Sequence, residues 1–176
     1  VCTGGKNEDN IHTGIERMID DLRAAGIETW DLDQVEIEVQ NMVATYALHY
    51  PEDYPGNDKF TGEPQAGVPR KLNLNNLTFH LPFDKVEYEP EQFPGVVYRV
   101  TDPKLAILMF RSGRAVCTGG KDEDNIHTGI DRMIKDLRAA GIETWDLKDV
   151  TIEVQNMVAT YALHYPEDYD GVDKFT

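Results

Sequence analysis

Apolar and polar residues alternate with a period of two between positions 35 and 43. Val35, Ile37, Val39, Asn41 and Val43 fall on one face of an extended chain, as expected for a strand with one covered face. One member of this series, Asn41, is an amide. The pattern therefore predicts a strand that carries a single hydrogen-bonding side chain among apolar neighbours.

A helical period of apolar residues follows between positions 122 and 140. Acidic residues occupy its first turn, Arg138 lies in its last turn, and Gly141 follows as a stop signal. The apolar stripe consists of Ile126, Ile130, Met133, Ile134 and Leu137. This segment is predicted to be an amphipathic helix lying on a sheet.

Short strands are expected between these two elements. They are Val96–Val100, Leu105–Arg111 and Arg114–Thr118. The dipeptides Asp102-Pro103 and Ser112-Gly113 between them are typical of turns, so the strands are antiparallel neighbours. The segment 105–110 is apolar on both faces, which predicts a sheet covered on both sides although helices are available for only one.

Two further segments complete the pattern. Leu74, Leu77 and Leu81 have helical spacing up to Pro82, with Asn73 as a capping residue, which predicts a short helix. Residues 46–71 are rich in Tyr, Pro, Gly and Asp and predict a long loop.

The chain contains a tandem repeat. At an offset of 115, residues 1–61 and 116–176 are identical at 53 of 61 positions, and every Ile, Leu, Met and Trp is unchanged. This predicts the later part of a preceding repeat at 1–34, a complete repeat at 35–143 with the loop 46–71, and the first part of a following repeat at 144–176. Because the sheet partners recur, we expect residues 150–158 to pair with residues 1–4.

The net charge of −15 argues against a nucleic-acid partner, since Lys and Arg make most phosphate contacts. Its distribution changes this reading. Between positions 99 and 121 there are five basic residues and one acidic residue, a local balance of +4. Acidity elsewhere suits a protein that works in concentrated salt, where charges are screened beyond about 3 Å at 1 M. An ordinary acidic protein is the alternative.

The composition predicts a soluble, intracellular protein. No apolar run approaches the ~20 residues that a membrane-spanning helix requires. Cys2 and Cys117 occupy the same position in two copies, without CxxC spacing, and are expected to be buried free thiols.

Enzymatic chemistry is not expected, because His12, His49 and His80 belong to no Ser/His/Asp set and no phosphate-binding glycine loop is present. No cofactor is expected. A metal site formed by His49, Glu52 and Asp53 is conceivable, but such a group of side chains occurs often by chance.

Three blocks of the sequence, 86–99, 107–114 and 116–121, closely resemble archaeal TATA-box-binding proteins (TBPs), and residues 39–43 match the same family. The resemblance implies an α+β fold: a curved antiparallel sheet with helices on its convex face, built from repeats into a saddle. The concave face of this saddle would bind the minor groove of DNA. The second face of the predicted sheet would thereby gain a partner.

The resemblance also implies roles for individual residues. Phe93 and Phe110 match the family's phenylalanines that enter between base steps. Asn41 and Asn156 match its minor-groove asparagine, whose amide suits the acceptors of A·T pairs. Its apolar and hydroxyl floor is matched by Val43, Leu108, Val116, Thr118, Val158, Val1 and Thr3.

Polar positions complete the implied site. Arg99, Ser112 and Arg114 match phosphate contacts, and Glu89 and Glu91 match the turn that the family presents to transcription factor B. Without the resemblance, these residues are ordinary solvated strand ends and an exposed acidic turn, and Phe110 is a core aromatic.

We therefore expect a basal transcription initiation factor of the archaeal cytoplasm, located at the nucleoid, that binds and bends A·T-rich promoter DNA and recruits transcription factor B. The alternative is a protein-interaction module that keeps the saddle without binding promoters. The long loop and a third partial copy are departures from the family that favour this alternative.

Overall fold

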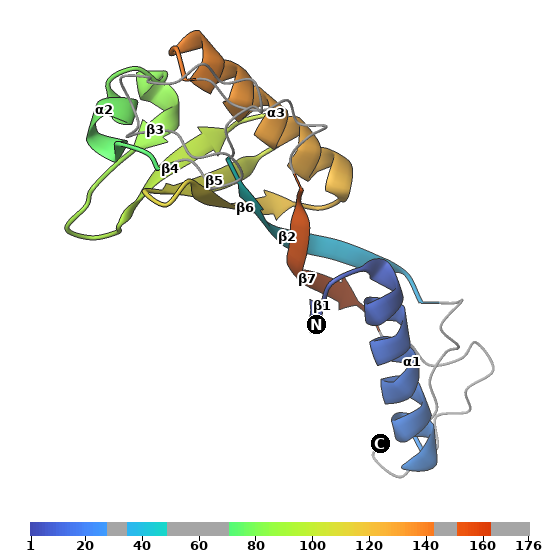
Figure 1. The fold of residues 1–176 in the computed structure, drawn as a ribbon. Helices are drawn as coiled ribbons and strands as arrows, with labels where there is room; N and C mark the ends of the chain where they lie inside the picture. Colours follow the sequence, from blue (N-terminus) through green and yellow to red (C-terminus); the bar gives the residue numbers. More distant parts are fainter. Residues whose placement is uncertain (28–34, 49–70, 143–150, 163–176) are drawn as a thin grey trace. The chain divides into compact units, whose positions relative to one another are not determined.

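A computed structural model describes residues 1–27, 35–48, 71–142 and 151–162. The chain has an α+β fold with one seven-stranded sheet, ordered β1-β7-β2-β6-β5-β4-β3 (Figure 1). The strands are β1 (Cys2–Gly5), β2 (Ile37–Ala47), β3 (Val86–Glu87), β4 (Gly95–Val100), β5 (Leu105–Phe110), β6 (Arg114–Gly120) and β7 (Glu153–Tyr161). The helices are α1 (Glu8–Ala24), α2 (Leu74–Thr78), the 3-10 helix η2 (Phe83–Lys85) and α3 (Glu123–Ala139).

The chain divides into two compact units. Unit 1 comprises Val1–Asn41 and Gln155–Thr176, and unit 2 comprises Met42–Val154. Strand β2 contributes its first half to unit 1 and its second half to unit 2. The site residues are therefore placed within each unit separately.

Unit 2 is a sheet with one covered face. Strand register places Tyr98, Ile107, Cys117 and Ala44 in one row across β4, β5, β6 and β2, and all four are buried. Helix α3 packs on β4, β5 and β6, while α2 packs on β4. Because side chains alternate along a strand, the residues between these buried positions form the opposite face.

Helix α3 follows the predicted pattern closely. Asp122 caps it by accepting a hydrogen bond from the Asn125 backbone N–H at 2.6 Å. Gly141, at a φ of 83°, provides the left-handed conformation that ends such helices. The predicted stripe is fully buried, so the amphipathic reading of this segment is confirmed.

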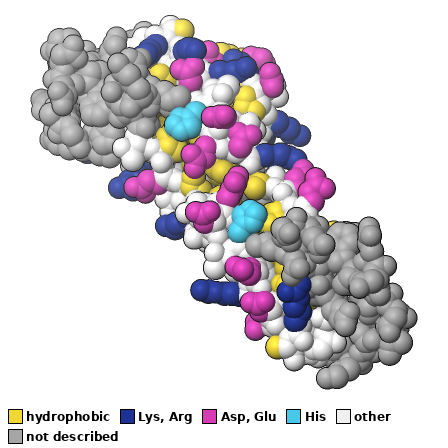
Figure 2. Space-filling view, turned by 90° about the vertical axis from the view of Figure 1, so that its right-hand side faces the viewer, with side chains coloured by type: hydrophobic (Ala, Val, Ile, Leu, Met, Phe, Trp, Pro, Cys, Tyr) yellow, Lys and Arg dark blue, Asp and Glu magenta, His cyan; other side chains and the backbone are white. Residues whose placement is uncertain are grey.

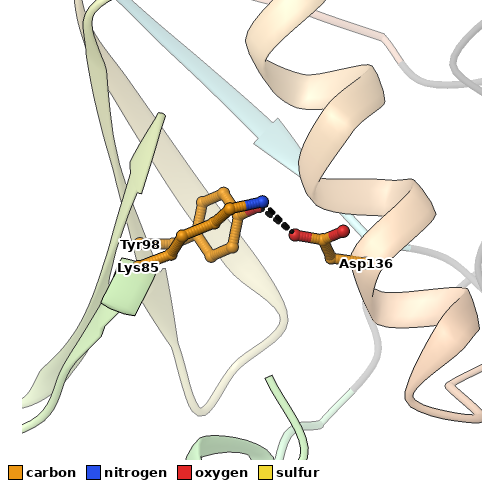
Figure 3. Close-up of polar contacts among 3 residues, drawn as sticks. All are labelled: Lys85, Tyr98 and Asp136. Carbon is orange, nitrogen blue, oxygen red and sulfur yellow. Dashed lines mark hydrogen bonds and ion pairs between the residues drawn. The ribbon is translucent and has the colours of Figure 1, made fainter. Parts of the chain in front are cut away.

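A polar cluster holds α3 to the sheet. The Tyr98 hydroxyl donates to Asp136 Oδ2 at 2.5 Å, and the Lys85 ammonium lies 3.0 Å from the same oxygen (Figure 3). Lys85 Nζ also lies 5.9 Å from the centre of the Tyr98 ring. Burial and the neighbouring carboxylate of Asp136 raise the pKa of Tyr98, so this hydroxyl remains a donor at neutral pH.

Unit 1 repeats part of this arrangement. Strand β1 pairs antiparallel with β7, with Cys2 opposite Ala159 and Thr3 opposite Val158. This confirms the expected pairing of residues 150–158 with residues 1–4. Helix α1 packs on β1 and buries Ile11, Ile15 and Ile19.

Differences from the predicted elements are small and have physical reasons. Strand β2 continues to Ala47, beyond the predicted end at 43, because β6 pairs with it as far as Arg114. The short helix ends at Thr78, before the predicted limit at Pro82, and is followed by a turn in which the N–H groups of His80 and Leu81 both donate to the Leu77 carbonyl oxygen. Asn73 caps the helix as predicted. Cys117 is buried as expected, whereas Cys2 is only half-buried, so the prediction for Cys2 is wrong.

Residues 49–70, most of the predicted loop, lie outside the described residues, as do His49, Glu52 and Asp53. None of the helices in the described part of the chain is long and apolar enough to cross a membrane.

Candidate nucleic-acid interface

The face of unit 2 opposite the helices, here called the open face, consists of aligned rows of side chains. One row joins Val97, Leu108, Val116 and Thr45. The next joins Arg99, Ala106, Thr118 and Val43. Except for the exposed Arg99, every member is half-buried. Since the helices of unit 2 pack on the other face, the rows form an apolar surface with few hydrogen-bonding groups.

Two phenylalanine rings stand together beside this surface. Phe110 lies at the end of β5, and Phe93 lies just before β4, so the two meet across the β4–β5 hairpin. Their ring centres are 5.7 Å apart, with planes inclined at 61°, an edge-to-face arrangement. A Cβ at Gly95 would lie 2.8 Å from a carbon of the Phe93 ring and 3.2 Å from one of Phe110. The glycine therefore makes room for both rings.

Unit 1 fixes the orientation of one amide. The Asn156 carbonyl oxygen accepts from the Gly4 backbone N–H at 2.8 Å and from the Thr3 hydroxyl at 3.3 Å. With this oxygen engaged, the NH₂ group of Asn156 is the side of the amide that is oriented to donate to a ligand. Thr3 also lies opposite Val158 in the β1–β7 pair, which brings three predicted residues together.

Two further predicted residues, Val1 and Asn41, are less closely grouped with the others. Val1 precedes β1 and is 82% exposed. Asn41 lies in the first half of β2, where its side chain is half-buried.

The predicted phosphate contacts have different surroundings. The Arg99 guanidinium makes two hydrogen bonds with the Glu87 carboxylate, at 2.8 and 3.0 Å. These bonds lower the pKa of Glu87 and raise that of Arg99. A phosphate would therefore compete with Glu87 for Arg99, whereas Arg114 and Ser112 are exposed around the β5–β6 turn.

The predicted partner-binding residues occupy a turn before β4. The backbone N–H groups of Gln92 and Phe93 both donate to the Glu89 carbonyl oxygen at 2.9 Å. The Gln92 side chain donates to the Glu89 carboxylate. Glu89 and Glu91 are both exposed, so the turn presents acidic groups outward.

Sequence reasoning missed several members of the open face. Val97, Ala106 and Thr45 lie in its rows, and Gly95 supports the two phenylalanines. The period of two would have found Thr45, two residues beyond Val43. Val97 has apolar neighbours on both sides, so alternation alone cannot assign its face.

The protein's charge is unevenly placed with respect to these elements. Acidic side chains are spread across the view in Figure 2, in keeping with the net charge of −15. The local excess of basic residues falls on the segment 99–121, which includes β5, β6 and their turn. Positive charge is therefore concentrated on the segment that contains two strands of the open face, within an acidic protein.

Known proteins are similar to this chain in sequence and in fold. The family model described as transcription factor TFIID (or TATA-binding protein, TBP) matches residues 65–140. The TATA-box-binding protein of Picrophilus torridus is 40% identical over 141 residues, covering 80% of this chain and 65% of that protein. TATA-box-binding protein 2 of Haloferax volcanii is 38% identical over 142 residues, covering 81% of this chain and 64% of that protein.

A solved structure agrees with these matches. Methanococcus jannaschii TBP superposes with a TM-score of 0.52 at 34% sequence identity, covering 70% of this chain and 57% of that one. The chain thus spans somewhat less than two thirds of the length of these relatives, 65% for the Picrophilus protein.

The fold and its open face define a class of α+β protein in which an antiparallel sheet, covered by helices on one side, offers an apolar surface on the other. The matches make the assignment specific. The chain belongs to the TATA-box-binding protein family and is of the archaeal type. The expectation that it is not an enzyme agrees with this family of transcription factors.

Proposed function

We propose that this protein is a basal transcription initiation factor that binds and bends A·T-rich promoter DNA through its open face. The observation that carries the proposal is the half-buried apolar surface with Phe93 and Phe110 paired beside it. Such a surface fits the minor groove, where apolar side chains inserted between base steps unstack and kink the duplex.

Selectivity would follow from the apolar floor of unit 2 and, separately, from an oriented amide in unit 1. A smooth apolar floor leaves the guanine N2 amino group without a hydrogen-bond partner, which disfavours G·C pairs. The Asn156 NH₂ group, oriented by Gly4 and Thr3, would donate to the N3 or O2 acceptors that A·T pairs present. Arg114 and, once released from Glu87, Arg99 would hold phosphates without reading sequence.

Fluorescence anisotropy tests this proposal with the full chain, comparing a TATA-containing duplex with a G·C control at about 0.1 and 1 M KCl. We expect A·T-selective binding that Phe110→Ala abolishes. Phe79→Ala is the matched control, because Phe79 is 86% exposed and belongs to the α2 side of the sheet.

We also propose, from the acidic composition, that the protein comes from a salt-loving archaeon, and binding that persists at 1 M KCl would support this origin. The identities of 40% to the Picrophilus relative and 38% to the Haloferax relative favour neither lineage. Equal binding to both duplexes, or none at either salt concentration, would contradict promoter recognition and favour a protein-interaction module.

We also propose that the exposed turn containing Glu89 and Glu91 contacts transcription factor B, so that the protein acts at the nucleoid. A charge-reversed variant, Glu89→Lys/Glu91→Lys, should bind DNA at least as well as the parent but fail to form the slower-migrating ternary complex on native gels. A ternary complex of unchanged stability would exclude this turn.

A further inference from the structure

Hydrogen bonds fix the backbone on which each ring of the phenylalanine pair is mounted. The Phe93 N–H donates to the Glu89 carbonyl oxygen at 2.9 Å. The Gly113 N–H donates to the Phe110 carbonyl oxygen, also at 2.9 Å. Pro94 follows Phe93 and restricts its backbone to extended conformations. The rings can therefore change their separation only by rotating about their own side-chain bonds.

Gly95 lies beside both rings, and its backbone does not require a glycine. It begins β4 directly opposite Phe110 in the β4–β5 pair, and it is buried. Five described glycines have a positive φ, and Gly95 is not among them. Other residues could therefore adopt its conformation, so it is the surrounding space that excludes a side chain at this position.

Three atoms would crowd a methyl group at position 95. A Cβ at Gly95 would lie 2.8 Å from Phe93 Cε1 and 3.2 Å from Phe110 Cε1. It would also lie 3.0 Å from the Met109 carbonyl oxygen. Met109 belongs to β5, which is paired on both sides by β4 and β6, so this carbonyl group has little freedom to move. The Phe93 ring, at the far end of its side chain, would have to turn away.

Turning the Phe93 ring away would separate the pair. In the structure the ring centres are 5.7 Å apart and the rings meet edge to face. Both rings are half-buried, so they support each other while each keeps a surface that can meet a base step. Because the pair is assembled in the free protein, DNA binding need not supply the free energy to assemble it.

We propose that Gly95 is a positioning residue for DNA bending, which keeps Phe93 and Phe110 in contact so that they enter the duplex as a single wedge. This proposal rests on the function proposed above and adds what determines the extent of the bend. Inserted apolar side chains open a base step and kink the duplex. Since the opening depends on the combined size of what enters, two rings in contact bend the duplex more than two rings held apart.

Fluorescence energy transfer between dyes at the two ends of a TATA-containing duplex measures the bend at saturating protein. The full chain with Gly95→Ala should stay folded, because the Phe93 ring can yield. Its bend should be at most about half that of the parent. Gly14→Ala is the matched control: it adds the same methyl group where the nearest described atom would lie 3.8 Å away, and it should bend the duplex as the parent does.

A double-mutant cycle tests whether Gly95 acts through the Phe93 ring. Phe93→Leu removes the ring carbon that a methyl group at position 95 would meet, and it should reduce the bend by itself. Gly95→Ala added to Phe93→Leu should then change the bend little, because the two positions are coupled. Any thermal stability that Gly95→Ala alone loses should be recovered in the double variant.

Nuclear Overhauser effects between the ring protons of Phe93 and Phe110 provide a readout without DNA. They should be strong in the free parent protein and in Gly14→Ala, since the ring centres are 5.7 Å apart. They should be weak or absent in Gly95→Ala. A merely structural role of Gly95 would lower stability without separating the rings.

Three results would overturn the proposal. One is a bend in Gly95→Ala equal to that of the parent. Another is the same reduction of the bend by Gly95→Ala with and without Phe93→Leu. The third is an unchanged set of ring-proton effects in Gly95→Ala. If the ring-proton effects follow the expected pattern but the parent itself does not bend the duplex, the function proposed above fails, and this proposal falls with it.

Discussion

At the scale of single residues, Gly129 and Gly14 occupy the same place in two helices of nearly identical sequence. Gly129→Ala would drive a methyl group against Leu105, and such overpacking costs about 1–3 kcal/mol. Gly14→Ala meets only ordinary contacts and should gain up to ~1 kcal/mol of helix propensity. Urea unfolding should show a lower free energy of unfolding for Gly129→Ala and a higher one for Gly14→Ala. Equal effects would mean that Leu105 moves aside freely.

The burial of the Cys117 thiol should make the protein less stable at alkaline pH. Burial raises its pKa from 9.0 to about 12, so between these values the unfolded state is ionised while the folded state keeps its proton. The free energy of unfolding should therefore be unaffected below pH 9 and fall above it, by about 1.4 kcal/mol per pH unit for this group. Unfolding curves from pH 8 to 11 should fall less steeply for Cys117→Ala. Parallel curves would contradict this assignment.

Residue patterns predicted helix caps and stops well, but they did not predict contacts between segments that are far apart in sequence. The cap at Asn73 and the stop at Gly141 depend on neighbours in sequence, so the sequence was sufficient. The ion pair of Arg99 with Glu87 depends on the pairing of β3 with β4, which the sequence did not reveal. Cys2 was misjudged because β6 pairs with β5 as well as β2, whereas β1 pairs with β7 alone among the described strands.

At the scale of elements, Asp136 joins α3 to β4 and η2, whereas Asp21 at the same position in α1 joins nothing described. Asp136→Ala removes hydrogen bonds from Tyr98 and Lys85 and should lower the free energy of unfolding by about 1.5–3 kcal/mol. Asp21→Ala is the matched control and should change it by less than about 0.5 kcal/mol. Thermal unfolding of the two variants measures this contrast. Similar losses would mean that the effect belongs to the helix and not to the cluster.

Element types were predictable because the apolar periods of this chain are long and clear. The strands from Gly95 to Gly120 and helix α3 follow directly from alternation, turns and one stripe. The ends of β2 were not predictable in the same way. Its length is set by pairing with β6, a contact between segments far apart in sequence.

At the scale of the whole molecule, the net charge of −15 disfavours DNA binding. In addition, Glu87 forms an ion pair with Arg99, one of the residues proposed to contact phosphate. Glu87→Gln should tighten DNA binding severalfold at about 0.1 M KCl, because it releases Arg99 as well as removing one negative charge. Glu123→Gln in α3 removes the same charge away from the open face and should have a smaller effect. In anisotropy titrations near 1 M KCl, the parent protein and the two variants should bind DNA with similar affinity, because charges are then screened beyond about 3 Å.

An equal gain from Glu87→Gln and Glu123→Gln would show that total charge, and not the release of Arg99, controls affinity. Only part of the site could be predicted from the sequence. The apolar floor and the two phenylalanines were predicted from the resemblance, whereas the competition for Arg99 depends on the pairing of β3 with β4.

The sequence Cys-Thr-Gly-Gly of β1 recurs within β6, so β5 has two possible partners while the chain folds. The turn from β5 to β6 closes over Arg111–Gly113, whereas about a hundred residues separate β1 from β5. Loop closure costs about 0.6 kcal/mol more for each doubling of length, so the distant pairing is disfavoured by roughly 3 kcal/mol before any contact is compared. The order of elements along the chain thus protects a nearly duplicated sequence from pairing with the wrong copy of itself.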